Sequence, residues 1–336
     1  MSSTFAFPSP VGGVSLPSDL GSSVFFVLLH ASLLPVLVWR ISNSNSRAIL
    51  SMSSMIGILE RMIIFSLRSV QSHDDALRVR KGLLIYVQST LGGTYIWIAM
   101  DVVTLARCLM VNSTKGPITQ DTPHNDPSAS PFSTEAPPSS TSHFVNGDVS
   151  VDQPRNRKFY RRFTDFWRLL YFAAAIPGII AGIRYYSSTT NPTTADYVMA
   201  LRYASSGIAL LCNIFSAGVV AWIATNIPGI RRGQIIYLLA ILACGASTAI
   251  YRLAFMYNRA TSFTSTAPGS GNTAAEKAAF YIFHILSDWG AIALMLVPNV
   301  RRWFNTGLLG DYRSSDPPHE LAAQELVKTR TNNNAV

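Results

Sequence analysis

Charged residues are scarce in this chain. Asp, Glu, Lys and Arg make up 13% of its 336 residues and apolar residues 49%, whereas about 25% of a typical soluble domain is charged. This composition excludes an ordinary soluble globular domain. The 27 Lys and Arg exceed the 18 Asp and Glu, but most basic residues flank apolar runs. Membrane topology and anionic headgroups of membrane lipids explain that placement, so we predict membrane lipids and no nucleic acid as partners.

Cysteine is also sparse, and the usual catalytic patterns are missing. The three cysteines, Cys108, Cys212 and Cys244, each lie inside an apolar run, which excludes a disulfide framework of paired loop cysteines. No His or Cys cluster has metal-ligand spacing, and neither a P-loop nor a G-x-S-x-G turn occurs. We therefore predict no metal, no cofactor and no enzymatic activity.

The amino terminus lacks positive charge. The first basic residue is Arg40, which follows the apolar run 24–39. A cleaved signal peptide would begin with a positive segment. This pattern instead predicts an uncleaved first membrane helix whose N-terminus lies outside the cell.

Long apolar runs are what the chain has in abundance. They predict an all-α fold, a polytopic membrane bundle of seven transmembrane helices, at residues 22–39, 48–67, 82–111, 166–185, 198–224, 234–257 and 278–300. The basic residues favour an outside N-terminus and a cytoplasmic C-terminus. We expect an integral protein of the plasma membrane rather than of an internal membrane.

The polar segments divide the chain between these helices. The predicted layout is an extracellular N-terminus, helices one to three, a disordered cytoplasmic loop rich in Ser, Thr and Pro, helices four to seven, and a disordered cytoplasmic tail. The corresponding ranges are 1–21, 22–111, 112–158, 159–304 and 305–336.

A few ionisable residues interrupt the apolar runs. Glu60, Asp101 and Asp288 are the acids at depth, and a central Asp costs about 2.5–3.5 kcal/mol on insertion scales. These residues must therefore face other helices, where Arg61, Arg107, Arg202 and Arg252 are candidate cationic partners.

The last span places His284 and Asp288 one turn apart on one face. We predict that Arg252 and Asp288 form an internal ion pair, bridged by His284 or by water. Because histidine can titrate near neutral pH, the pair could also couple to protons. The alternative is a purely structural role, since polar residues hold membrane helices together at about 0.6 kcal/mol per hydrogen bond.

Four stretches together resemble one known family: GILERMIIFSLRS, YVQSTLGGTYIWIAMDVVTLARCLM, AIYRLAFMYNR and EKAAFYIFHIL. They are similar to the fungal lipid-translocating exporters, seven-span proteins associated with aminocholesterol resistance and long-chain-base export. The resemblance involves Glu60, Gln88, Arg107 and Arg252, and it implies the same architecture and an amphiphilic cargo. Where the family favours Asp in the last span this chain has His284, and the acid follows one turn later.

The sequence thus predicts a membrane protein that exports, translocates or confers resistance to lipid-like amphiphiles. Its candidate polar-core or substrate residues are Glu60, Gln88, Asp101, Arg252, His284 and Asp288. The alternative is a seven-helix receptor or sensor, which the outside N-terminus and long cytoplasmic loop allow. That loop, however, follows the third span, which ends in Ala106-Arg107-Cys108 rather than an acid-Arg-aromatic triplet. The sequence does not set the oligomeric state.

Overall fold

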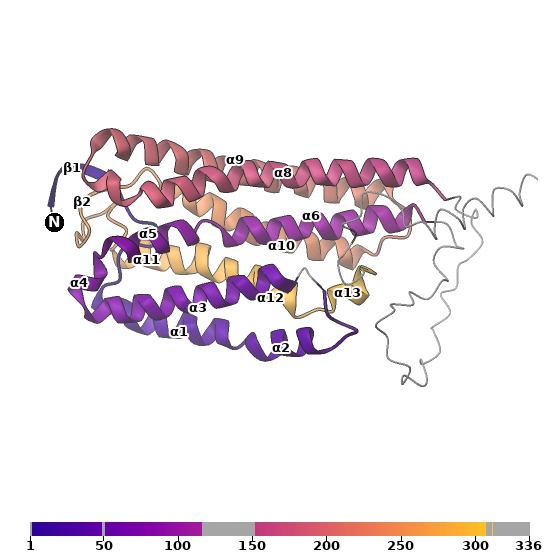
Figure 1. The fold of residues 1–336 in the computed structure, drawn as a ribbon, viewed down its shortest axis with the longest axis horizontal. Helices are drawn as coiled ribbons and strands as arrows, with labels where there is room; N and C mark the ends of the chain where they lie inside the picture. Colours follow the sequence, from indigo (N-terminus) through magenta and orange to yellow (C-terminus); the bar gives the residue numbers. More distant parts are fainter. Residues whose placement is uncertain (1, 49–50, 116–151, 307–310, 312–336) are drawn as a thin grey trace, which may run out of the picture.

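Long helices lie side by side in a bundle (Figure 1). The computed structural model describes residues 2–48, 51–115, 152–306 and 311. Its longer helices are α1 (Leu20–Ala31), α2 (Leu34–Ser42), α3 (Ser51–His73), α5 (Lys81–Thr90), α6 (Thr94–Ser113), α8 (Pro154–Arg184), α9 (Pro192–Asn226), α10 (Arg232–Phe255) and α12 (Ser287–Leu296). Shorter pieces are α4 (Asp75–Arg78), α11 (Ala274–Ala279), α13 (Val300–Trp303), two 3₁₀ turns (Pro17–Asp19 and Tyr186–Thr189) and a π-helix (Phe280–Leu286).

Six helical segments are long and apolar enough to cross a membrane: Pro17–Ser42, Lys81–Ser113, Pro154–Arg184, Pro192–Asn226, Arg232–Phe255 and Ala274–Leu296. The helical class is thereby confirmed, and six of the predicted spans coincide with helices of sufficient length and apolar character to cross a membrane. The remaining predicted span is also a helix, α3, but Glu60, Arg61 and Arg68 make it too charged to count among the six. Most of the predicted polar loop and tail, 116–151 and 312–336, lies outside the described residues.

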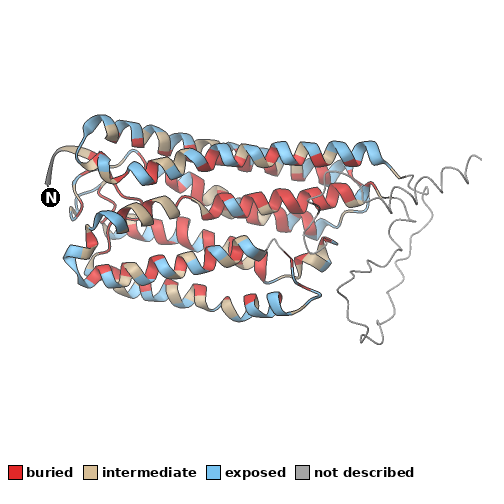
Figure 2. Ribbon diagram, in the orientation of Figure 1, coloured by how far each residue is buried: buried red, intermediate tan, exposed pale blue. Residues whose placement is uncertain are grey.

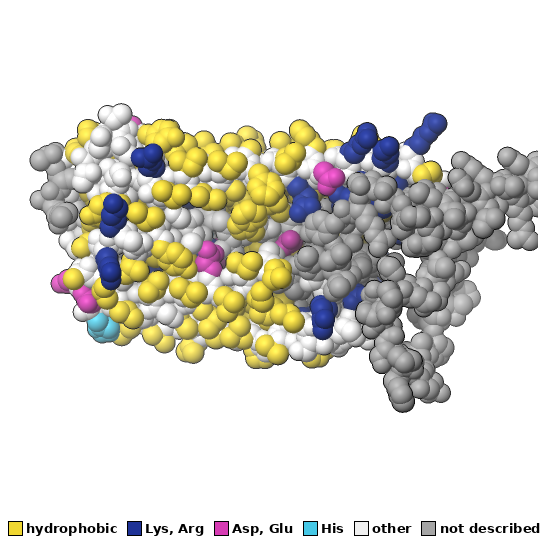
Figure 3. All heavy atoms as spheres, in the orientation of Figure 1, with side chains coloured by type: hydrophobic (Ala, Val, Ile, Leu, Met, Phe, Trp, Pro, Cys, Tyr) yellow, Lys and Arg dark blue, Asp and Glu magenta, His cyan; other side chains and the backbone are white. Residues whose placement is uncertain are grey.

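The bundle exposes an apolar surface and buries many of its polar side chains beside an apolar core. Yellow hydrophobic side chains cover the middle of the surface in Figure 3, and most of the Lys and Arg side chains seen on that face lie toward the two ends. On α9, Leu211 and Ile214 are 67% and 60% exposed while Arg202 and Asn213 are buried. Such an exposed apolar belt fits a lipid environment, not water.

The segment α5–α6 is the central one. Of its apolar stretch 89% is buried, against 28–50% for the other five segments, and Figure 2 shows this burial along α6. The sequence predicts one continuous helix here, but the structure breaks it between Thr90 and Thr94. Gly92 lies in the break, where a Cβ would lie 3.2 Å from Nη2 of Arg252. The missing side chain thus lets the arginine of α10 approach the backbone.

The N-terminal segment closes one end of the bundle. Strand β1 (Ser2–Pro8) pairs antiparallel with β2 (Arg259–Ser262), with Phe7 opposite Ala260. Residues 7–15, which we call the N-terminal plug, are all buried. This stretch belongs to the predicted extracellular N-terminus, 1–21, and it packs between the helix ends.

Backbone carbonyls of the plug accept hydrogen bonds from buried basic side chains. Arg202 Nη1 donates to Ser9 O at 2.9 Å, Arg68 donates to Gly12 O at 2.9 Å and Gly13 O at 3.2 Å, and Lys277 Nζ donates to Val14 O at 2.5 Å. Arg78 Nε donates to Ser15 O at 2.6 Å. The plug contains no charged residue, so it can be buried while it satisfies these cations.

Gly13 tests whether the plug stabilises the bundle. Its φ is +61°, and a Cβ there would lie 2.3 Å from the Gly271 carbonyl oxygen. We expect Gly13→Ala to lower the free energy of unfolding by at least about 1 kcal/mol and to expose the N-terminus to protease. Thermal unfolding in detergent and limited proteolysis measure both effects.

Gly21→Ala is the matched control, because Gly21 lies in α1 with no atom within 4 Å of an added Cβ. It should leave both measurements unchanged or improve stability slightly. Equal behaviour of the two variants would show that the plug does not contribute to stability.

Candidate functional site

A buried ion pair joins α3 to α12. Arg61 Nη2 lies 2.5 Å from Asp288 Oδ2, and neither side chain has any exposed surface. Thr248 of α10 donates to the other carboxylate oxygen at 3.3 Å. The predicted partner of Asp288, Arg252, is therefore replaced by Arg61. Adjacent helical residues point about 100° apart, so Arg61 turns inward while half-buried Glu60 accepts from Thr94 Oγ1 at 2.9 Å.

Arg252 is buried, and no carboxylate among the described residues forms an ion pair with it. Its Nε donates to Ser206 Oγ of α9 at 3.3 Å, and its guanidinium lies against Gly92. Within the described part of the chain, Nη1 makes no hydrogen bond. Arg202 and Asp288 are near enough to interact with it electrostatically.

His284 lies between the two arginines, in the π-helix that precedes α12. Its ring stacks on Tyr251 at 5.8 Å between centroids and contacts the edge of Phe280 at 5.4 Å. Both Arg61 and Arg252 act on it electrostatically. Neither ring nitrogen makes a hydrogen bond of normal geometry with a described residue, so His284 does not bridge Asp288 to Arg252 as the sequence suggests.

Gln88 connects this region to the N-terminal plug. Its side-chain oxygen accepts from Val11 N at 3.0 Å and from Arg202 Nη2 at 2.8 Å, and its amide nitrogen donates to Val11 O at 3.3 Å. The residue thus fixes the plug to α9. Asp101 belongs elsewhere: Ser53 donates to it, two helical turns beyond Thr94 along α6.

We define the polar cluster as Arg61, Tyr95, Arg202, Arg252, His284 and Asp288, all buried. The cluster holds three guanidinium groups and one buried carboxylate, so positive charge predominates. Sequence reasoning found Arg252, His284 and Asp288, and it named Arg61 and Arg202 only as partners. It missed Tyr95, whose hydroxyl makes no hydrogen bond of normal geometry with a described residue; an aromatic residue in an apolar run gives no signal.

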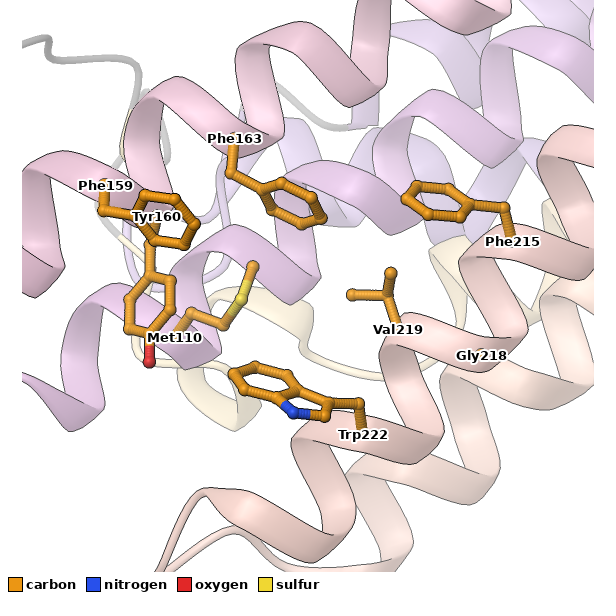
Figure 4. Close-up of a pocket in the computed structure, with 8 residues that line it drawn as sticks. All are labelled: Met110, Phe159, Tyr160, Phe163, Phe215, Gly218, Val219 and Trp222. Carbon is orange, nitrogen blue, oxygen red and sulfur yellow. The ribbon is translucent and has the colours of Figure 1, made fainter.

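A separate apolar groove of about 400 Å³ lies between α6, α8 and α9. Its walls are mostly aromatic, and Figure 4 shows the rings and aliphatic side chains turned toward a common space. The lining residues are Met110, Phe159, Tyr160, Phe163, Phe215, Gly218, Val219 and Trp222. Phe215 is 13 residues beyond Arg202 on α9, or about 20 Å along the helix. The groove is thus distinct from the polar cluster and suits an alkyl chain.

The described residues include no group of three or more His, Cys, Asp or Glu side chains that could hold a metal ion. The donors of the polar cluster are mostly positive or neutral, which suits water or an anion better than a cation.

The Arg61–Asp288 pair generates a stability prediction. Arg61→Met leaves Asp288 buried and unpaired, so we expect it to lower the free energy of unfolding by about 3–5 kcal/mol. The double variant Arg61→Met/Asp288→Leu should recover most of that loss, because it removes both charges. Denaturant unfolding in detergent of the unchanged protein, Arg61→Met, Asp288→Leu and the double variant measures the coupling.

The exposed pair Arg259–Asp196, at 2.8 Å with side chains 41% and 70% exposed, serves as the control. The equivalent substitutions there should couple by no more than about 1 kcal/mol. If the Arg61 and Asp288 losses were simply additive, the ion pair would not exist in the folded protein.

Comparisons with models of known protein families, with curated proteins and with solved structures find no match to this chain. Its function is therefore inferred from the polar cluster, the apolar groove and the helix arrangement.

Proposed function

We propose that this protein is a seven-span membrane protein that exports, translocates or confers resistance to lipid-like amphiphiles, with its N-terminus outside the cell. The six long apolar helices support a multi-pass arrangement. Helix α3 is the proposed seventh crossing. It lies alongside α1 in the bundle (Figure 1), and its Arg61 and Arg68 are fully buried among other helices, so they need not contact lipid.

The observation that carries the proposal is a polar cluster between two interrupted helices. The α5–α6 break lies beside Arg252, and the π-helix contains His284. Broken helices at the binding site are common in membrane transporters, and π-helical turns often mark functional sites. A continuous, fully apolar helix pair would be sufficient for a purely structural bundle.

The two surfaces match the two parts of an amphiphile. The polar cluster offers hydrogen-bond donors to a headgroup, and the aromatic groove offers apolar walls to a chain. The likeness of four sequence stretches to the lipid-translocating exporters points to the same class of cargo.

The proposal predicts movement of amphiphiles across a membrane. In vesicles of phosphatidylcholine, the purified protein should accelerate transfer of at least one labelled amphiphile from a panel containing a long-chain base, a sterol amine and phosphatidic acid. Because Asp288 and His284 belong to the polar cluster, Asp288→Asn and His284→Ala should each slow transfer at least about tenfold, which equals 1.4 kcal/mol. A fluorescence-quenching assay across the bilayer measures the rate.

His73→Ala is the control, since His73 is exposed at the end of α3 and its loss should not alter transfer. Deletion of the protein in its host cell should also reduce tolerance to the transferred compound. If no amphiphile moved faster and deletion changed signalling without changing tolerance, the receptor alternative would replace this proposal.

A further inference from the structure

The polar cluster contains more buried hydrogen-bond donors than its own residues use. Among the described residues, Nη1 of Arg252 and both Nε and Nη1 of Arg61 have no partner. Arg61 has no exposed surface, and Arg252 is 3% exposed. A buried guanidinium N–H without an acceptor is costly, so these donors point to an acceptor that the described residues do not provide.

The charges around these donors determine whether a negatively or a positively charged ligand is favoured. The cluster contains three guanidinium groups, those of Arg61, Arg202 and Arg252, and Asp288 is its one fully buried carboxylate, already paired with Arg61. The nearby carboxylate of Glu60 is half-buried and accepts from Thr94. An added amine would be repelled by the surplus guanidinium charge, whereas an oxyanion would be attracted.

The backbone at the α5–α6 break adds to this preference. The guanidinium of Arg252 lies over Gly92, two residues before α6 begins at Thr94. The amino end of α6 carries partial positive charge and favours anions, whereas the carboxyl end of α5 at the same break carries partial negative charge that the guanidinium of Arg252 offsets. An oxyanion between Arg252 and this helix end would therefore meet positive charge from both sides.

Neutral groups could complete the coordination. Ser206 is already in contact with Arg252 at 3.3 Å, and Tyr95, on the first turn of α6, interacts electrostatically with Arg252. Hydroxyl groups can donate to an anion without adding charge.

We propose that Arg252, Arg61 and the amino end of α6 form a binding site for an oxyanion, of the phosphate or carboxylate class. The inference rests on the proposed function for the expectation that the oxyanion is the headgroup of an amphiphile. It narrows that function, because it favours acidic amphiphiles over amine-headed ones. The N-terminal plug lies over the same end of the bundle and shares Arg202 with the cluster.

Binding to the full-length protein in a neutral detergent tests the site without requiring transport. The probes are short-chain phosphatidic acid, inorganic phosphate, the matching phosphatidylcholine and a long-chain amine. We expect phosphatidic acid to bind and to raise the thermal unfolding temperature. Arg252→Gln should weaken that binding at least about tenfold, the scale of one charge-assisted hydrogen bond.

Two further variants separate binding from folding and from net charge. Arg252→Lys keeps the positive charge. If Arg252→Gln weakens binding of phosphatidic acid because the positive charge is lost, Arg252→Lys should recover most of the affinity. Arg232→Gln removes the same charge from the exposed start of α10 and should bind like the unchanged protein.

The four probes also distinguish between the possible sources of the oxyanion. Binding of phosphatidic acid but not inorganic phosphate supports a lipid headgroup, and equal binding of both supports a free anion at the same site. Absence of anion binding, tighter binding of the amine, or equal weakening by Arg232→Gln would overturn the site. Transfer of a long-chain base by a protein that binds no anion would leave the proposed function standing and reject this inference alone.

Discussion

Every other feature of this bundle depends on how it shields buried positive charge from lipid. The Arg61–Asp288 pair satisfies one guanidinium directly, at 2.5 Å with both side chains fully buried. It also ties α3, the helix whose apolar stretch carries too many charges to count among the six long apolar segments, to α12. Without that pair, a charge on α3 would face hydrocarbon or an apolar helix, and either arrangement is costly. The position of α3 is thus set by electrostatics as much as by apolar packing.

Four buried cations at the plugged end of the bundle are satisfied largely by backbone, although Lys277 also pairs with Asp19 and Arg78 with Asp75. Carbonyl groups of the N-terminal plug accept hydrogen bonds from Arg68, Arg78, Arg202 and Lys277. A segment with no charged residue thus supplies acceptors to many of the buried donors at this end of the bundle. Arg252 lies deeper than the plug reaches, and its Nη1 keeps no acceptor among the described residues. The same constraint therefore accounts for both the closed end and the proposed oxyanion site.

The helices could be predicted from the sequence because long apolar runs have few alternatives in a membrane. The pairing of charged side chains inside the bundle could not be predicted from the sequence. Glu60 and Arg61 are adjacent, and nothing in their spacing indicates which of the two side chains points into the bundle. The sequence therefore favours Arg252 as the partner of Asp288, and this prediction is wrong because Arg61 points inward and forms the pair. The break at Gly92 depends on Arg252, a residue far along the chain. The plug depends on pairing of Phe7 with Ala260, a contact that no local pattern reports.

The most direct test of the account is the environment of single nitroxide labels along α9 in lipid vesicles. With the three native cysteines replaced, labels at Leu211 and Ile214 should be accessible to oxygen and protected from a polar nickel chelate, because both side chains are exposed on the apolar belt. A label at Ser206, which is buried beside Arg252, should be poorly accessible to oxygen. High oxygen accessibility at Ser206, with chelate access at Leu211, would mean that the charged face points toward lipid and would contradict the account.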